Sequence, residues 1–597
     1  MTERRSIDPV LTAVLSNRID SIVREMTNTL LRAARSAVIN SARDFSCGIC
    51  TADNELLACA DGLPIHSFGA SLQTRTMCEL HAGDLREGDA YLHNDPFSGN
   101  THAADHTFLV PVFFEGEHLF TAVAKAHQAD IGNSLPTTYH VTAKDIYEEG
   151  ALIFPAVRIQ RDGRMNDDII RMCQARIRAP GQWYGDFLAG LGAARIAERR
   201  LKELCAKYGR DVVKGFVADW LDYSEQRMAQ AIRRLPKAHV VNTGAHDPIA
   251  GVIPQGIPIR AEIDIDPEAA RITVDLTDNI DNVACGLNVS EACTISATLT
   301  GIFNSMPPDI PKNSGTFRRI TLKLADGKVI GRPRFPHSCS VATTNVSDRL
   351  VNCVGAAFAS LGEGFGVAEG GVGMGVGMAV ISGTDARDGS AYVNQLIIAN
   401  NGGPASPFAD GWVTYELPDG SGLTYRDSVE IDELKHPIEF AHVRLVPGSA
   451  GAGRFRGSPG GDVAFGPTHG GMTVIFPCDG TVVPARGVRG GLDGSLAAAW
   501  HLRADGTAER LPNAVNLTIG EGEMVRGLDC SGGGYGDPLE RDPARVLEDV
   551  RERWETAARA RDIYGVAFTG DPDDDDCAVD PAATSALRTT LRAARTR

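Results

Sequence analysis

Two short His-x-Ala-Asp motifs stand at the ends of residues 101–130 of this chain. The first places His102 three residues before Asp105, and the second places His127 three residues before Asp130. Imidazole nitrogens and carboxylate oxygens are ligands that divalent ions such as Zn²⁺, Mn²⁺ and Fe²⁺ accept. If the four side chains meet, they predict a metal centre. A polar strand end with His–Asp hydrogen bonds and no metal is the alternative.

The residues between the two motifs predict a β-hairpin that would bring them together. Residues 107–114 and 119–126 are apolar runs rich in Val and Phe, and the loop Glu115-Gly116-Glu117 separates them. Apolar runs of this length around a short glycine-containing loop are typical of a hairpin.

The register of that hairpin decides which side chains face one another. With the turn at Gly116, Asp105 would lie opposite His127, and His102 opposite Asp130. Directly paired residues on neighbouring strands have Cβ atoms about 4.5–5.5 Å apart. The spacing therefore predicts two histidines and two carboxylates at the open end of the hairpin.

The flanking segments hold further candidates. Asp44 stands near the start of an alternating stretch, residues 42–50, that predicts a strand. It becomes an additional donor if this strand lies beside the hairpin, and otherwise it caps the strand. His66 lies in a glycine-containing loop, where it would contact a substrate or serve as a buried structural histidine. Glu148 and Glu149 would reach the same pocket or be solvated.

The predicted elements indicate an α+β chain with several subdomains. Asp8-Pro9 is a typical helix start, and helical spacing of apolar residues predicts one long helix, or two in tandem, over residues 10–40. The expected regions are an N-terminal α/β region carrying the metal-binding hairpin (1–235), a central mixed α/β region (236–430), a β-rich, glycine-rich region with a closing helix (431–567) and a charge-biased, mobile tail (568–597).

Composition argues against several classes of function. The chain has 597 residues and a formal net charge of −17 without a Lys/Arg stripe, which argues against nucleic acid and anionic membrane surfaces as partners. Its polar start does not resemble a signal peptide, and no apolar run is long enough to span a bilayer. The 13 cysteines are scattered, and Cys47-x-x-Cys50 lacks the second half of a zinc motif. We therefore expect reduced core thiols and a cytoplasmic protein.

Nucleotide-binding motifs are missing from the sequence. Residues 370–377 alternate glycine with apolar residues, but no Lys-Ser/Thr follows them. Neither GxxxxGK[ST] nor GxGxxG between a strand and a helix occurs elsewhere. A reaction that uses ATP would therefore need the nucleotide on another chain.

Several motifs taken together make the chain similar to one known family. They occur in order along residues 8–567: Asp44-Phe-Ser-Cys, Asn94-Asp-Pro-Phe-x-Gly-x-Thr-His, Ala126-His-Gln-Ala-Asp-Ile-Gly132, Glu149-Gly150, Pro311-x-Asn-x-Gly315, Gly453-Arg-Phe-Arg-Gly457 and Gly532-Gly-Gly-Tyr-Gly-Asp-Pro538. On these motifs the chain resembles the hydantoinase B/oxoprolinase family.

The resemblance implies a metal site and a partner. The family's metal centre corresponds to Asp44, His102, Asp105 and His127, which leaves Asp130 to orient a ligand or to accept a proton. The metal would be Zn²⁺ or Mn²⁺, or else Fe²⁺. A hydantoinase A-like subunit in a hetero-oligomer would carry ATP and Mg²⁺, in agreement with the missing phosphate loop.

The resemblance also implies a reaction, the ATP-dependent opening of a cyclic amide or imide such as a hydantoin, an oxoproline or a lactam. The metal would activate water and stabilise an oxyanion, with Asp130 or His66 accepting the proton. ATP-dependent carboxylation of a ketone would use the same metal residues, and a non-catalytic scaffold for the ATP-binding partner is a third hypothesis. Residues 99–105 lack the Leu-Pro that many relatives carry before Asp105, so the substrate is left open.

Overall fold

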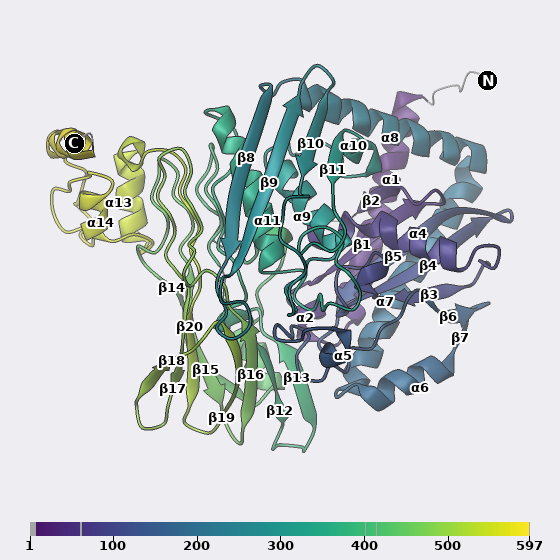
Figure 1. Cartoon of the computed structure of the whole chain (residues 1–597). Coiled ribbons are helices and arrows are strands. Elements are labelled where there is room, and N and C mark those ends of the chain that lie inside the picture. Colours follow the sequence, from purple (N-terminus) through teal and green to yellow (C-terminus); the bar gives the residue numbers. More distant parts are fainter. Residues whose placement is uncertain (1–7, 60–61, 400, 414, 596–597) are drawn as a thin grey trace.

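The computed structural model describes residues 8–595 except residues 60–61, 400 and 414. The described residues form four sheets with helices packed around them, which confirms the predicted α+β class. Figure 1 shows the N-terminal elements on the right and the last helices at the far left, so the two ends of the described chain lie at opposite sides of the molecule.

The N-terminal region is built on a seven-stranded sheet in the order β2-β1-β5-β4-β3-β6-β7. Helix α1 begins where the Asp8 carboxylate accepts a hydrogen bond from the Val10 amide at 2.8 Å, as predicted. The buried side chains of α1 recur at helical spacing and pack against α7, which covers β4 and β5. The elements are α1 (Pro9–Ala33), α2 (Ala37–Asn40), β1 (Phe45–Thr51), β2 (Leu56–Cys59), α3 (Pro64–Ser67), α4 (Ala70–Leu80), β3 (Ala90–His93), η1 (Pro96–Ser98), β4 (Asp105–Phe114), β5 (Glu117–His127), α5 (Ile146–Glu149), β6 (Val157–Arg161), β7 (Arg164–Met165), α6 (Asp167–Arg176), α7 (Pro180–Tyr208) and α8 (Arg210–Ile232).

Strands β4 and β5 form the predicted hairpin. Its turn includes Gly116, whose φ of +80° is the left-handed conformation that such turns require. The register pairs Asp105 with His127, as predicted. The ladder begins at this pair, so it does not extend to the expected pairing of His102 with Asp130. Neither the segment before Asp105 nor the segment after His127 continues as a strand.

The central region packs a four-stranded sheet, in the order β11-β10-β9-β8, against helix α11. Strands β9 and β10 form an antiparallel pair of alternating apolar residues, with Ile263 opposite Val274. The elements are β8 (Ala238–His246), β9 (Ile257–Asp266), β10 (Arg271–Asp275), α9 (Glu291–Phe303), α10 (Ser314–Phe317), β11 (Ile320–Lys323), α11 (Val346–Ala357), η2 (Phe358–Leu361), η3 (Val376–Met378), β12 (Val380–Thr384), β13 (Ala391–Gln395), η4 (Pro418–Gly420) and α12 (Val429–Lys435).

In the glycine-rich region, extended segments pack backbone against backbone. A Cβ built on Gly532 would lie 1.9 Å from the carbonyl oxygen of Gly403, and one built on Gly457 would lie 2.0 Å from that of Gly532. Backbone hydrogen bonds join the segments, such as the one from the Gly451 amide to the Gly532 carbonyl at 2.9 Å. Only glycine permits this spacing, because any side chain would overlap a neighbouring carbonyl.

Two further sheets, in the orders β13-β12-β16-β19 and β14-β15-β20-β17-β18, complete the β-rich part. The closing helix that the sequence predicts is divided into two short helices, α13 and α14. Arg553, between them, has a φ of +62°, which ends the first helix. The elements are β14 (Ile438–Leu445), β15 (Gly461–Pro467), β16 (Met472–Pro477), β17 (Ala498–Leu502), β18 (Ala508–Arg510), β19 (Ala514–Ile519), β20 (Met524–Leu528), η5 (Pro538–Glu540), α13 (Pro543–Arg551) and α14 (Ala557–Asp562).

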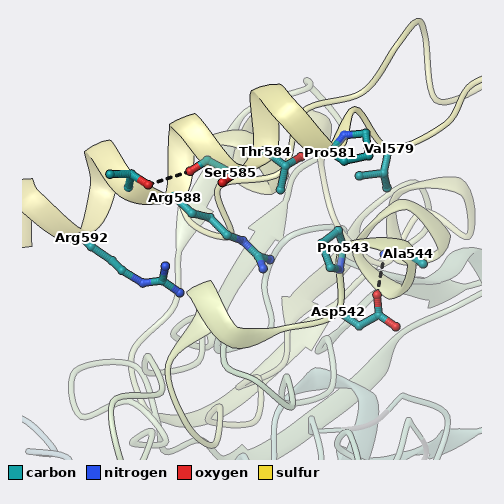
Figure 2. A pocket seen from close by; sticks show the side chains of 10 residues that line it. Asp542, Pro543, Ala544, Val579, Pro581, Thr584, Ser585, Arg588 and Arg592 are labelled. Atoms are coloured by element: carbon teal, nitrogen blue, oxygen red, sulfur yellow. Dashed lines mark hydrogen bonds between the residues drawn. The ribbon is translucent and has the colours of Figure 1, made fainter.

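The C-terminal segment, where the charge bias predicts a mobile tail, is partly helical. It contains helix α15 (Pro581–Arg595), which faces the start of α13 across a cavity of about 510 Å³ (Figure 2). Arg588 donates to the carbonyl oxygen of Tyr564 at 3.0 Å and to that of Arg541 at 2.6 Å. Arg595 contacts Asp537 at 2.7 Å. The arginines recur at helical spacing and therefore attach one face of the helix to the body of the protein.

Three large apolar clusters make up most of the core. One joins α1 and α7 to the hairpin, the second runs from Leu63 to Val393, and the third runs from Val372 to Cys530. All 13 cysteines lie in the described residues and form no disulfide, and burial raises the pKa of both Cys47 and Cys50 to about 12. None of the described helices combines the length and the apolar character needed to cross a bilayer.

Candidate metal centre

The open end of the hairpin carries three of the predicted ligands. Asp105 is the first residue of β4 and lies opposite His127, the last residue of β5. His102 joins them from the turn before β4. The side-chain amide of Asn100 fixes this turn by donating to the carbonyl oxygens of His102 at 2.8 Å and Asp105 at 2.9 Å. The three side chains therefore lie at the end of a hydrogen-bonded ladder that limits their movement.

Three donor atoms converge within this end of the hairpin. Nε2 of His102 lies 3.1 Å from Oδ1 of Asp105, and Nδ1 of His127 lies 3.3 Å from the same oxygen. The two nitrogens are 3.2 Å apart. Ligand atoms held tetrahedrally at about 2.0–2.1 Å from a metal are themselves about 3.3 Å apart. The triangle thus has the size of one face of a zinc-type coordination shell.

The outer nitrogens of both imidazoles contact other groups, which orients the inner nitrogens. Nδ1 of His102 donates to the backbone carbonyl of Ser340 at 2.9 Å, so the ring in its neutral form presents a lone pair at Nε2. Nε2 of His127 lies 2.9 Å from the Thr138 hydroxyl, and its ring stacks on Tyr139 with centroids 5.1 Å apart. With Nε2 donating to Thr138, Nδ1 also presents a lone pair. Lone pairs this close to each other and to a carboxylate fit a bound cation.

Asp44 and His66 border the same centre from two other elements. Asp44 directly precedes β1, which pairs with β5, so this strand lies beside the hairpin and meets the condition under which Asp44 could be an additional donor. Its carbonyl oxygen accepts from the His127 amide at 3.1 Å. His66, in α3, places Nε2 3.5 Å from the Asp44 carboxylate and 3.2 Å from Oδ2 of Asp105. One imidazole therefore lies between two carboxylates.

Asp130 is directed toward a different partner. Its carboxylate contacts the Arg178 guanidinium at 2.8 Å and accepts from the Gly132 amide at 3.1 Å. These contacts hold the loop after β5 against the segment that precedes α7. The structure thus brings His66 to the ligand cluster, whereas it engages Asp130 with Arg178.

The comparison with known protein families shows to which family the chain belongs. The family model described as hydantoinase B/oxoprolinase matches residues 8–538. The chain belongs to this family. Its relatives include the caprolactamase β subunit of Pseudomonas jessenii, 29% identical over 591 residues that cover 98% of this chain and 99% of the relative. The acetophenone carboxylase δ subunit of Aromatoleum aromaticum is 26% identical over 612 residues, covering 94% and 86%.

Solved structures agree with this membership of the hydantoinase B/oxoprolinase family. The crystal structure of the ATP-dependent caprolactamase from Pseudomonas jessenii matches with a TM-score of 0.87 and 27% identity, covering 98% of this chain and all of that one. The nucleotide-free structure of acetone carboxylase matches with a TM-score of 0.88 at 17% identity, covering 99% and 83%. The second match shows a shared fold.

Burial and neighbouring charges shift the pKa values of several groups in the centre of this hydantoinase B/oxoprolinase chain. Burial raises the pKa of Asp105, but His66 and His102 outweigh burial and hold that pKa well below its usual range. Burial lowers the pKa of His102, but Asp105 outweighs it and raises the pKa. Burial lowers the pKa of Lys125 to about 8, and its amine donates to the Thr101 hydroxyl at 3.2 Å. Thr101 in turn contacts the Asp105 carboxylate, which therefore remains an anion.

Sequence reasoning missed most of the groups that surround the ligands. Ser340 and Thr138, which orient the two histidines, carry no signal in the sequence because their positions depend on contacts between distant segments. Lys125 was detectable, since it alternates with the histidine that ends β5 and so shares its face of the strand. Of the two glutamates left open, Glu149 is buried and accepts from the Ser338 hydroxyl at 2.7 Å, whereas Glu148 is exposed.

Proposed function

We propose that this chain is the metal-binding catalytic subunit of an ATP-dependent enzyme that opens a cyclic amide or imide of the hydantoin, oxoproline or lactam type. The buried triangle of His102, Asp105 and His127, with donor atoms 3.1–3.3 Å apart, is the observation that carries the proposal. Asp44 completes the proposed ligand set, whose nitrogen and oxygen donors suit Zn²⁺, Mn²⁺ or Fe²⁺. The caprolactamase relative supports the class of substrate.

The residues of the centre have distinct proposed roles. When bound, a divalent ion at this site supplies a Lewis acid that lowers the pKa of water and stabilises negative charge on oxygen. His66 is the proposed proton acceptor, because the carboxylates of Asp44 and Asp105 on either side of Nε2 would stabilise its protonated ring. Asp130 is proposed as a positioning residue, since its ion pair with Arg178 holds the loop that follows β5.

ATP is proposed to act on a separate, hydantoinase A-like subunit, together with Mg²⁺. An amide carbonyl resists attack by water at neutral pH, and phosphorylation of its oxygen would activate it. This chain has no nucleotide-binding loop with which to carry out that phosphorylation. The relatives named as β and δ subunits support a hetero-oligomer. We place this assembly in the cytoplasm, because the reduced cysteines are suited to that compartment.

Carboxylation of a ketone is the second candidate function. Both the acetophenone carboxylase δ subunit and the acetone carboxylase structure resemble this chain along most of its length. The same residues would then hold the ion, which would supply stabilisation of negative charge on a substrate oxygen instead of activation of water. A non-catalytic scaffold is the third candidate, and it predicts that the purified chain holds no metal.

Turnover with and without bicarbonate tests these candidates. The chain is coexpressed with its ATP-binding partner and assayed with MgATP, a small lactam or ketone, and ¹³C-bicarbonate. The proposal predicts phosphate release and a ring-opened product without ¹³C in either condition, and a fall of at least about 100-fold in the His127→Ala variant. The His118→Ala variant, at the opposite end of the same strand, should remain active. Bicarbonate-dependent ¹³C incorporation, or full activity of His127→Ala, would contradict it.

A further inference from the structure

We propose that the open cavity between α3, α8 and α9 is the vestibule through which the substrate reaches the metal centre, and that the contact between Leu63 and Gly420 is its inner gate. The inference rests on the proposed function, because it assumes a small substrate that must reach the metal. The cavity has a volume of about 710 Å³, which is within the range of small-molecule sites.

The lining of the vestibule suits a small ring with one polar end. Phe68 and Phe303 form part of its wall, with ring centroids 5.6 Å apart, and Leu57 and Trp220 add further apolar surface. The Lys312 ammonium lies 5.9 Å from the centre of the Phe303 ring. Methylene groups of a lactam would pack on the aromatic rings, and its carbonyl oxygen, or an anionic derivative of it, would face the lysine.

Helix α3 separates the vestibule from the metal centre on one side. Pro64 and Ser67 line the cavity, whereas His66 of the same helical turn places Nε2 within 3.5 Å of Asp44 and 3.2 Å of Asp105. The wall between cavity and ligands is therefore a single turn of helix.

The segment around η4 closes the other side. Ser421 and Leu423 line the cavity directly after η4, which packs against α3. A Cβ on Gly420 would lie 3.7 Å from Cδ2 of Leu63, so the two segments meet at this point. The Ser46 hydroxyl, two residues after Asp44, donates to the Leu63 carbonyl at 3.2 Å. The backbone of Leu63 is thus hydrogen-bonded to β1, the strand that directly follows Asp44.

Access to the metal requires such an opening. His102 and Asp105 are fully buried, and His127 is 1% exposed. A change in the rotamer of Leu63 would part its contact with Gly420 without breaking a backbone hydrogen bond. A Cβ at position 420 would lie at an ordinary van der Waals distance of 3.7 Å from Cδ2 of Leu63, so glycine there leaves the space beside Leu63 unfilled.

Selective labelling of a native thiol tests the vestibule. Cys59 lines the cavity, and Cys59 and Cys78 are the two cysteines that are not buried. In the Cys78→Ser complex, a bulky maleimide attached to Cys59 should slow metal transfer to the chelator dipicolinate at least about 10-fold. In the Cys59→Ser complex, the same reagent on Cys78 should change that rate less than about 2-fold. Failure of Cys59 to react, or equal rates in the two labelled complexes, would overturn the proposal.

A pair of leucine variants tests the gate. Leu63→Ala removes the contact with Gly420, whereas Leu57→Ala removes a buried side chain of the same cavity away from that contact. Both variants should lose stability, but only Leu63→Ala should release metal to dipicolinate faster, by about 10-fold after correction for unfolding. Equal release from both variants would contradict the gate.

Protection by a small lactam tests the class of ligand. Millimolar 2-piperidone should slow maleimide labelling of Cys59 and leave that of Cys78 unchanged, and no protection would reject the vestibule as a lactam site. These rates are measured without turnover, so they separate this inference from the proposed reaction. A wild-type complex without metal would instead reject the proposed function.

Discussion

At the scale of single residues, the direction in which each side chain points determines whether that residue is part of the candidate centre. Residue types and spacing were sufficient to predict that His127 and Asp105 meet, because strand pairing is a local rule. They did not predict the direction of the Asp130 side chain, because the ladder of paired strands ends before that residue. Its carboxylate instead pairs with Arg178, which comes from a distant segment. The inward nitrogen of His102 likewise depends on a carbonyl far along the chain, that of Ser340.

Asp529 offers a residue-scale test of electrostatics outside the centre. Neither oxygen of its buried carboxylate has a hydrogen-bond partner among the described atoms, and burial raises its pKa to about 7. Because the folded-state pKa exceeds the unfolded value, this group lowers the free energy of unfolding as pH rises from about 4 to about 7, and the loss persists above that. Asp529→Asn should therefore be more stable than wild type at pH 8, by on the order of 4 kcal/mol at most, and nearly equal to it near pH 4.

Urea unfolding of both proteins at pH 5 and pH 8 checks this expectation. The advantage of Asp529→Asn should grow between the two pH values. A variant that is less stable than wild type at pH 8 would show that the carboxylate is stabilised as an anion.

At the scale of elements, local patterns predicted the hairpin and α1, because each follows from apolar periodicity within a few residues. The glycine-rich packing followed from no such pattern. Gly403 and Gly532 are far apart in the sequence, and their close approach is visible only in the structure. Helix α15 was missed for a related reason, since its arginines bind carbonyls of other segments.

Paired glycine substitutions test the backbone packing. A methyl group at Gly532 would overlap the Gly403 carbonyl at 1.9 Å, so Gly532→Ala should cost at least about 3 kcal/mol of stability or prevent folding. Gly192, in the middle of α7, has open space around its Cβ position. Gly192→Ala should therefore stabilise the protein by about 0.5–1 kcal/mol. Thermal unfolding of both variants distinguishes them, and a Gly532→Ala protein as stable as wild type would contradict the described packing.

At the scale of the whole molecule, the candidate metal centre lies where the N-terminal hairpin meets the central region. His127 comes from the hairpin and His102 from the turn that precedes it, while Ser340 and the η4 segment come from later in the chain. The second apolar cluster, from Leu63 to Val393, joins the two regions. Composition and motifs predicted the fold class and the residue types that meet at the hairpin end, but only long-range packing shows that this cluster is enclosed.

Metal content is the most direct test of the account. The complex with the ATP-binding partner, purified without added metal, is analysed by inductively coupled plasma mass spectrometry as wild type, His127→Ala and His118→Ala. We expect about one divalent transition-metal ion per chain in wild type and His118→Ala, and almost none in a folded His127→Ala protein. A full complement of metal in His127→Ala, or a metal-free and fully active wild type, would contradict the proposed centre.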